Sequence, residues 1–358
     1  MTRPSLLVLA SDALFPHFFS AESQKKLDEV TDWTRSSLRE DSSALREQIA
    51  QADVLMTTWH TPYVTAEMLG PDPRLKLIAH CGGEVKSRFE EQIFDYVTIT
   101  NAAEPMARGV AEMALALTLT LVRRIPAYAS EMRDGVVRTN EEVSTGESLF
   151  GRNVGLVGFG RIGRAFAKLI GPFEVQLLVS DPYAQPDTIA EYGGSLVDLD
   201  DLVRSCSVII LAAALTTETK SLFDKRRLSL MADDSCLINV ARGGLIDLEP
   251  FLAELRAGRI TAALDVTDPL EPLPVDHELR KLPNVILTPH IAAGGIEMRR
   301  AMGALAIDEV VRFATGQPPL NRVTREMLAT MTCFITRLDI CTTRGENVSE
   351  REVSTRWR

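Results

Sequence analysis

The chain contains few cysteines, and none of them pair with the spacing of a metal site or a disulfide framework. Five occur in 358 residues, an odd number without any Cys-x-x-Cys pattern; they are Cys81, Cys206, Cys236, Cys333 and Cys341. Small secreted scaffolds and cysteine-based zinc sites both need paired spacings, so neither class fits this chain. The cysteines therefore predict free thiols in a reducing, cytoplasmic compartment and no metal site.

An excess of positive charge is also missing. The chain carries 39 Lys and Arg against 49 Asp and Glu, a formal net charge of −10. A protein that binds nucleic acid through its overall electrostatic field needs clustered basic residues, so no nucleic-acid partner is expected.

Long hydrophobic runs are absent too. Residues 110–122 are interrupted by Glu112 and are shorter than the ~20 apolar residues that cross a bilayer, so no membrane partner is expected.

What remains is the composition of a globular protein, with 45% hydrophobic and 25% charged residues. A single core typically stops growing near ~250 to 300 residues, so the length predicts two domains. The first part of the chain alternates short apolar runs with amphipathic stretches, which predicts an α/β domain with a largely parallel sheet. Its predicted strands are residues 6–10, 54–57, 75–79 and 97–100.

The rest of the chain repeats the order of strand and helix, and its strands are more apolar. Strands are predicted at 153–157, 175–180, 207–212, 236–240, 261–266 and 285–288, and helices at 162–170 and 248–257. Buried strands that alternate with helices predict a Rossmann-type, doubly wound parallel sheet.

A last helix, predicted at 295–315, leads back to the first domain and makes that domain discontinuous. We therefore predict an α/β protein in which a Rossmann-type domain spans 105–293. The second, flavodoxin-like α/β domain is predicted to combine 1–104 with 294–333, followed by a polar tail at 334–358.

The helix predicted at 107–124 is apolar on more than one face. Val110, Ala114, Leu117 and Leu121 form one stripe, and other apolar residues surround it. A helix of this kind is buried, either in a core or in a subunit interface.

The segment GLVGFGRIGR has the glycine spacing of a dinucleotide-binding turn between a strand and a helix. Gly158 permits a tight turn, Gly160 lets the backbone approach a pyrophosphate, and Gly163 lets the helix pack closely on the strand. The N–H groups of Arg161 and Ile162 then point at a phosphate from a helix N-terminus, where an anion is favoured.

Asp181 lies 18 positions beyond Gly163, at the end of the next predicted strand. Its carboxylate is placed to accept hydrogen bonds from the adenosine ribose and to repel a 2′-phosphate, which favours NAD over NADP. The alternative is that Asp181 is only a turn residue before Pro182.

Three further polar residues follow predicted strands. Arg242 lies in NVARGGLID, Glu271 in the proline-rich segment after 261–266, and His290 in VILTPH. The carboxyl ends of parallel strands meet at one edge of a sheet, where open α/β sheets bind ligands. Each residue alone is commonly structural or solvated, and their joint placement favours a shared site.

These residue types suit the reduction of a carbonyl beside a carboxylate. An arginine binds a carboxylate through two parallel N–H bonds and polarises the neighbouring carbonyl. If Glu271 hydrogen-bonds His290, it stabilises the imidazolium, which donates a proton in reduction and accepts one in oxidation. A nicotinamide cofactor would supply the hydride.

In order along the chain, GFGRIG, SDPY, NVARGGLID, ALDV, LEPLP and TPHIA resemble the D-2-hydroxyacid dehydrogenase family from residue 1 to about 330. The resemblance implies an NAD-dependent enzyme that interconverts 2-keto acids and D-2-hydroxy acids. It makes 105–293 the NAD-binding domain and the discontinuous domain the substrate domain.

The resemblance also implies roles for individual residues. Arg242 binds substrate, and Glu271 pairs with the acid/base His290. The residues that it implies at the cofactor are Thr216, Val240, Ala241 and Asp265, the last at the nicotinamide carboxamide.

The segment IAHCGGEVK matches the family's glycine loop, whose backbone N–H groups receive the substrate carboxylate. This implies a substrate-binding role for Cys81, Gly82 and Gly83. The alternative is a plain turn after a strand. Many members have Gly-x-Gly followed by Asp here, whereas this chain has Glu84 and Val85 after its two glycines, so the resemblance leaves the substrate unidentified.

Two functions from different classes are consistent with these residues. The first is the NAD-dependent dehydrogenase. The alternative is an NAD(H)-binding sensor or corepressor-like protein, because a fold does not fix a function. The resemblance and the apolar helix 107–124 also suggest a homodimer formed through that helix.

Overall fold

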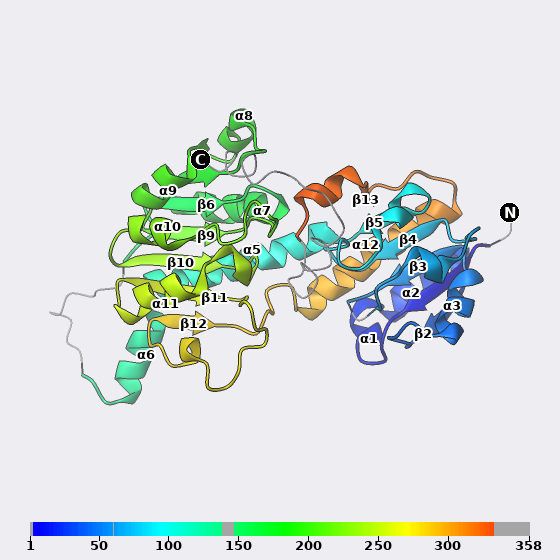
Figure 1. Ribbon diagram of the computed structural model, residues 1–358, viewed down its shortest axis with the longest axis horizontal. Coiled ribbons are helices and arrows are strands. Elements are labelled where there is room, and N and C mark those ends of the chain that lie inside the picture. Colours follow the sequence, from blue (N-terminus) through cyan, green and yellow to red (C-terminus); the bar gives the residue numbers. More distant parts are fainter. Residues whose placement is uncertain (1–2, 60, 138–146, 333–358) are drawn as a thin grey trace. The chain divides into compact units, whose positions relative to one another are not determined.

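The computed structural model describes residues 3–59, 61–137 and 147–332. These residues divide into two compact units. One lies within Met1–Ala107 and resumes at Ala293, and the other is Arg108–Ala292. Each unit is an α/β layer structure around its own sheet (Figure 1). The predicted tail at 334–358 lies outside the described residues.

The first unit contains a six-stranded sheet in the order β13-β5-β4-β3-β1-β2. Its strands are β1 (Ser5–Leu9), β2 (Asp32–Ser36), β3 (Val54–Thr57), β4 (Leu77–His80), β5 (Thr98–Asn101) and β13 (Arg322–Val323). All pairs are parallel except β13 with β5. The order 2-1-3-4-5 of the parallel strands is that of flavodoxin-like folds, which confirms the predicted fold class.

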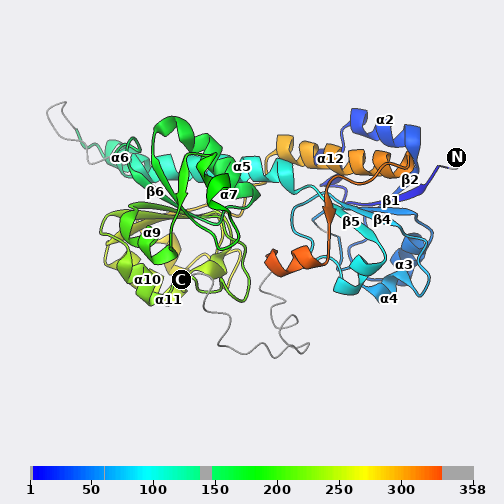
Figure 2. The same cartoon turned by 90° about the horizontal axis from the view of Figure 1, so that it is seen from above.

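Helices cover both faces of this sheet (Figure 2). They are α1 (Phe15–Phe18), α2 (Ala21–Val30), α3 (Ser43–Ala50), α4 (Ala66–Leu69) and α12 (Ile296–Ala314). Alternate side chains of β1 point to opposite faces of the sheet. Leu6 and Val8 pack with α1, α2 and α12 on one face. Leu7 and Leu9 pack with α3 and α4 on the other. Both faces of the central strands are buried, which explains why β1, β3 and β4 are apolar.

The second unit contains a seven-stranded parallel sheet in the order β12-β11-β10-β9-β6-β7-β8. Its strands are β6 (Asn153–Val157), β7 (Gln176–Ser180), β8 (Gly194–Leu196), β9 (Val208–Leu211), β10 (Ser235–Asn239), β11 (Ile260–Leu264) and β12 (Val285–Leu287). Numbered within the unit, the order is 3-2-1-4-5-6-7, which is the Rossmann order with one added strand. The strand order reverses between β6 and β9, where such sheets bind ligands.

The helices of the second unit are α6 (Ile125–Arg133), α7 (Arg161–Ile170), α8 (Pro186–Ala190), α9 (Leu199–Ser205), α10 (Lys225–Leu230) and α11 (Leu248–Arg256). In this unit α10 packs against α9 and α11 (Figure 2).

The long helix α5 (Ala103–Val122) begins in the first unit and continues into the second. One face is buried, through Ala107, Ala111, Ala114 and Leu117. Met113, Leu115 and Leu119 on the other faces stay partly exposed. Among the described residues α5 is the one helix long and apolar enough to cross a membrane, and 44% of that apolar window is buried within the fold.

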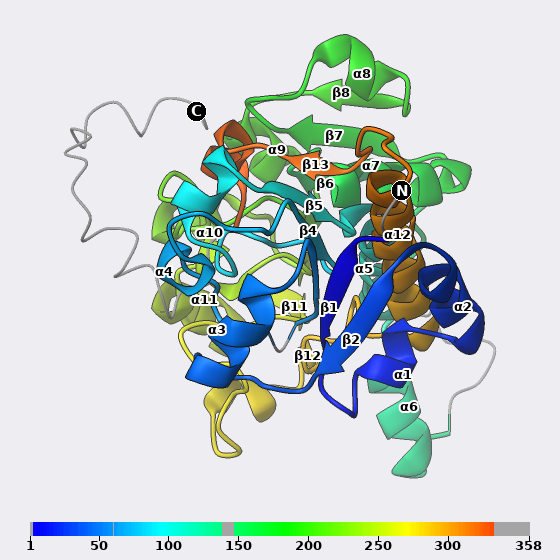
Figure 3. The same cartoon turned by 90° about the vertical axis from the view of Figure 1, so that its right-hand side faces the viewer.

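Strands β2, β8 and β13 and helix α6 were not predicted. Strand β2 has the polar sequence DWTRS and buries only Ser36, because it forms the edge of the sheet beside β1 (Figure 3). Helix α6 has no buried residue, so it carries none of the apolar periodicity that reveals a helix. The predicted start of the long helix at 107 was late by one turn.

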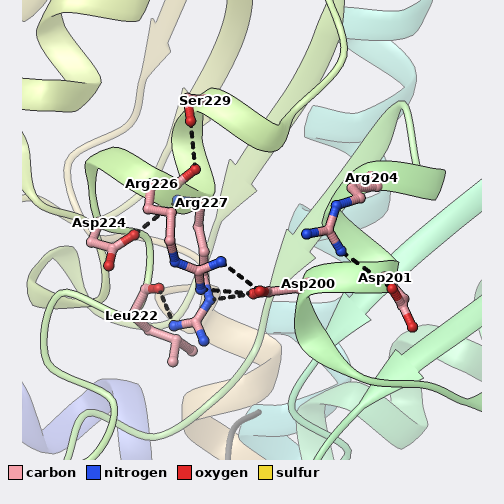
Figure 4. Close-up of polar contacts among 8 residues, drawn as sticks. All are labelled: Asp200, Asp201, Arg204, Leu222, Asp224, Arg226, Arg227 and Ser229. Carbon is pink, nitrogen blue, oxygen red and sulfur yellow. Dashed lines mark hydrogen bonds and ion pairs between the residues drawn. The ribbon is translucent and has the colours of Figure 1, made fainter.

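A cluster of ion pairs links α9 to α10 on the second unit (Figure 4). Asp200 accepts hydrogen bonds from Arg226 Nη1 at 2.5 Å and from Arg227 Nε at 3.0 Å. Hydrogen bonding from Arg226 lowers the pKa of Asp200 to about 2, burial opposes this, and Arg227 lowers it further. Only 26% of the Asp200 side chain is exposed, so solvent screens the pairs less than on an open surface.

We expect Asp200→Asn to lower the free energy of unfolding by about 1 kcal/mol at neutral pH, because both guanidinium groups lose their anion. A carboxyl whose pKa is depressed stabilises the fold above its ordinary pKa of 3.8 and loses that contribution as the pH falls through about 2. Urea unfolding should therefore show the full difference from wild type at neutral pH, and a shrinking one below about pH 4.

Asp201→Asn provides a matched control. Asp201 pairs with Arg204 at 3.3 Å, and 68% of its side chain is exposed. Its substitution should cost less than about 0.5 kcal/mol. Equal losses for the two variants would contradict the assigned role of Asp200.

Candidate active site

Two positions of the glycine turn after β6 have no room for a side chain. Gly158 has φ +96°, and an added Cβ would lie 2.6 Å from the backbone of Ala213. At Gly163 an added Cβ would lie 2.2 Å from the carbonyl oxygen of Gly158, so only glycine lets α7 approach the strand this closely. The alanine segment after β9 thus packs directly against the turn.

Gly160 has the opposite environment. A Cβ there would meet no atom within 4 Å, so the backbone faces open space. Gly160 is also the N-cap of α7 and provides no side-chain cap. The first N–H groups of α7, which belong to Arg161, Ile162 and Gly163, therefore suit an anion at the helix N-terminus. This turn fits the pyrophosphate of a dinucleotide.

Asp181 follows β7 and is tied to the same turn. Its Oδ2 accepts the N–H of Phe159 at 2.6 Å, and its Oδ1 accepts the N–H of Tyr183 at 2.8 Å. The carboxylate therefore braces the glycine turn in addition to any role toward a ribose. Sequence spacing indicated the position of Asp181 but not this bond to Phe159.

The loop that carries Arg242 is held by Asn239, a residue that sequence reasoning missed. Its fully buried side chain accepts the N–H of Ala241 at 3.0 Å and donates to the carbonyl of Arg242 at 2.9 Å. The next residue, Gly243, packs so closely that an added Cβ would lie 2.2 Å from Thr267. The Arg242 loop thus rests on the segment that leads to Glu271. Val240 and Ala241, between β10 and Arg242, are buried.

Asp265 directly follows β11 and organises the loop that carries His290. Its Oδ1 accepts Thr288 Oγ1 at 2.6 Å and the N–H of Ile291 at 3.0 Å, and its Oδ2 accepts the N–H of Ala292 at 2.9 Å. The carbonyl of Asp265 accepts the N–H of His290 at 2.9 Å. His290 itself has φ +54°, an uncommon conformation for a non-glycine residue that these surrounding bonds maintain.

Glu271 and His290 are in direct contact. His290 Nδ1 lies 2.9 Å from Glu271 Oε2, and Glu271 Oε1 accepts the N–H of Thr267 at 3.3 Å. Both side chains keep about a third of their surface exposed, at 34% and 36%. Burial raises the pKa of nearby Asp268, Lys220 opposes that rise, and the charge of Glu271 adds to it.

The strands that lead to these residues are neighbours. The order β12-β11-β10 places the carboxyl ends before His290, Asp265 and Arg242 side by side in one sheet. The structure therefore brings the Glu271–His290 pair together and rests the Arg242 loop on the same segment. Thr216 lies in the loop after β9, and its N–H donates to Thr219 Oγ1 at 2.8 Å.

In the first unit, the loop after β4 leaves two backbone donors free. Ala102 N donates to the carbonyl of Gly82 at 2.8 Å, and Asn101 Nδ2 donates to that of Gly83 at 2.7 Å. Among the described residues, the N–H groups of Gly82 and Gly83 have no acceptor. The N–H of Cys81 donates to the Thr57 carbonyl at 2.8 Å, so the expectation that it is a free donor needs correction.

The other side chains of this loop are inert or occupied. Burial raises the pKa of the Cys81 thiol and lowers the pKa of His80 to about 3, so both are neutral. Glu84, where the chain departs from the family pattern, is bound to Ser87 through Ser87 N at 2.6 Å and Ser87 Oγ at 2.5 Å. Its carboxylate therefore caps its own turn.

Comparison with known proteins identifies the family. Residues 115–292 match the model of the D-isomer specific 2-hydroxyacid dehydrogenase, NAD binding domain. The chain is 33% identical to a glyoxylate reductase of Thermococcus onnurineus, over 79% of this chain and 86% of that protein. It belongs to the D-isomer specific 2-hydroxyacid dehydrogenase family.

Other similar proteins agree with this assignment. A D-3-phosphoglycerate dehydrogenase of Archaeoglobus fulgidus is 32% identical over 73% of this chain and 49% of its own length. The crystal structure of the TT0316 protein from Thermus thermophilus superposes with a TM-score of 0.74 at 30% identity, covering 89% of this chain and all of that one. The chain is therefore an enzyme, an oxidoreductase with an NAD(P)-binding domain, rather than a sensor that only binds the cofactor.

We expect Asp265→Asn to lower kcat/KM about 10 to 100-fold, because an amide nitrogen cannot accept the N–H groups that hold the His290 loop, and small misplacement of a reacting group is costly. The measurement is NADH oxidation with glyoxylate, with Tm followed in parallel. Asp276→Asn, at an exposed position in the same region, is the control and should keep wild-type rates. Unchanged activity in Asp265→Asn would rule out the positioning role.

Proposed function

We propose that the enzyme reduces a 2-keto acid to the D-2-hydroxy acid with NADH, and catalyses the reverse oxidation with NAD. The observation that carries the proposal is the 2.9 Å contact between His290 and Glu271 at the end of strands adjacent to the one that leads to Arg242. Such a pair can move a proton, and an arginine beside it can bind the substrate anion.

His290 acts as the proton donor in reduction. Its Nδ1–H is donated to Glu271 Oε2, so Nε2 is the nitrogen that gives a proton to the carbonyl oxygen. Glu271 holds the ring in this orientation and stabilises the imidazolium before the proton is transferred. In oxidation Nε2 takes the proton of the hydroxyl group.

Arg242 binds the substrate carboxylate and polarises the adjacent carbonyl. Asn239 keeps its loop in place by accepting the N–H of Ala241 and donating to the carbonyl of Arg242. In the first unit, the free N–H groups of Gly82 and Gly83 are assigned to the substrate carboxylate. The side chain of Cys81 is buried and neutral, and it contributes only packing to that loop.

The residues assigned to the cofactor are those of the glycine turn, Asp181, Thr216, Val240, Ala241 and Asp265. When bound, the nicotinamide cofactor supplies the hydride. Asp265 Oδ2 accepts one N–H, from Ala292, and has a further lone pair for the carboxamide. Asp181 supports NAD over NADP, because its charge repels a 2′-phosphate.

We assign 105–293 as the NAD-binding domain and 1–104 with 294–333 as the substrate domain, close to the division observed between the two units.

A homodimer through the region of α5 is proposed as well, since Met113, Leu115 and Leu119 on this apolar helix are only partly buried in one chain. The buried free thiols Cys81 and Cys206 support a cytoplasmic location.

We expect His290→Ala to lower kcat about 100 to 10,000-fold with glyoxylate and NADH, because general acid catalysis is lost. Glu271→Gln should cause a smaller loss of the same kind. NADH binding, followed by fluorescence, should persist in both variants. His277→Ala, a histidine outside the proposed site, should keep full activity, and wild-type turnover in His290→Ala would refute the assigned chemistry.

The cofactor preference is tested with Asp181→Ala. Wild type should use NADH at least about 10-fold better than NADPH by kcat/KM, and the variant should lose most of that ratio because the repelling charge is gone. Asp187→Ala, which removes an exposed carboxylate on α8, should leave the ratio unchanged. Equal use of both cofactors by wild type would overturn the preference.

A further inference from the structure

We infer that the first unit recognises a second anionic group, a distal carboxylate, on the substrate, and that Arg299 on α12 binds it. The inference rests on the proposed function for the identity of the substrate as a 2-keto acid. It adds a substrate class, 2-keto dicarboxylates, that the family assignment does not specify.

Arg299 is held in place without a counter-ion. Its guanidinium carbon lies 5.2 Å from the centroid of the Trp59 ring, and Nη1 donates to His17 Nδ1 at 3.1 Å. Because His17 accepts this bond at Nδ1, it does not supply a negative charge. Nε of Arg299 is buried and has no hydrogen-bond partner among the described residues.

Several other arginines of the unit are paired with acids. Arg46 pairs with Asp41 and Glu67, each at 2.7 Å, and Arg74 pairs with Asp53 at 2.7 Å. Within the described part of the chain, Arg299 has no carboxylate in ion-pair distance. A guanidinium is always charged, and this one has no counter-ion, so a bound anion would stabilise this arrangement.

Trp59 connects Arg299 with the loop assigned to the substrate carboxylate. An added Cβ on Gly82 would lie 2.9 Å from the indole Nε1 of Trp59, so the ring borders the glycine loop while its face supports the guanidinium. Trp59 is held by two further contacts. The Phe18 ring packs edge-on against its ring with 5.4 Å between centroids, and Arg88 Nη1 donates to its backbone carbonyl at 2.5 Å.

This arrangement favours a carboxylate on the substrate side chain. A planar guanidinium presents two parallel donors that match the two oxygens of a carboxylate. A substrate whose first carboxylate is bound at Gly82 and Gly83 could then place a second one beyond Trp59. Glyoxylate has no side chain and would leave Arg299 without an anion.

The test compares oxaloacetate and 2-oxoglutarate, which carry a distal carboxylate, with pyruvate and glyoxylate, which do not. Wild type should show the highest kcat/KM with one of the two dicarboxylates. Arg299→Met should lower kcat/KM for that dicarboxylate about 10 to 100-fold, mainly by raising KM, because one charged hydrogen-bonded contact is lost. Its kcat/KM for glyoxylate should change less than about 2-fold.

Controls separate recognition from folding. Arg300→Met, at the exposed next position on α12, should leave both substrates unaffected. Arg299→Lys keeps a charge but not the planar fork, so it should lose part of the selectivity even if Arg299→Met fails to fold. Equal losses on glyoxylate and the dicarboxylate in the Arg299 variants would overturn the inference and make Arg299 structural.

Binding measurements distinguish this inference from the proposed reaction. In thermal-shift titrations, D-malate should raise the Tm of wild type more than D-lactate, and Arg299→Met should abolish the difference. If no 2-keto acid is turned over but this difference is found, recognition stands and the proposed reaction fails. If glyoxylate is turned over and D-malate is no better than D-lactate, the second anion site is refuted alone.

Discussion

The buried carboxylate of Asp265 is the interaction on which the candidate active site depends. It is 1% exposed, and its two oxygens accept a hydroxyl and two backbone N–H groups from the segment around His290. A buried charge is costly unless it is hydrogen-bonded in this way. The resulting bonds hold His290 at a positive φ, which points its ring at Glu271. Loss of the charge would therefore leave the histidine present but misplaced.

Three of the places where the chain is proposed to meet a ligand offer donors without an acceptor among the described residues. They are the uncapped N-terminus of α7, the N–H groups of Gly82 and Gly83, and the buried Nε of Arg299. Elsewhere, exposed cations such as Arg46 and Arg226 are satisfied by carboxylates of the chain itself. The contrast follows from the cost of a buried donor without an acceptor, which a bound anion removes. An anionic cofactor and an anionic substrate suit these positions.

Several structural features could be read from the chain because they depend on local pattern. The apolar strands and the glycine spacing at Gly158, Gly160 and Gly163 follow from burial on both faces of a parallel sheet and from close backbone approach. Strand β2 escaped prediction because an edge strand buries little, and α6 because it buries nothing. The bond of Cys81 N to Thr57 could not be anticipated either, since it joins the loop after β4 to the end of the neighbouring strand β3.

The sequence by itself determined the family, the two α/β sheets and the residue types available for chemistry, because glycine turns and apolar strands leave strong local signals. Only the tertiary structure decided which donors are free and which side chains meet. Asn239 supporting Arg242 and Glu84 bound to Ser87 are contacts within one loop, whereas Arg299 resting on Trp59 joins distant parts of the chain. For Arg299 and Trp59, 240 positions apart in sequence, no local pattern encodes the contact; the fold creates it by laying α12 against the sheet that carries β3.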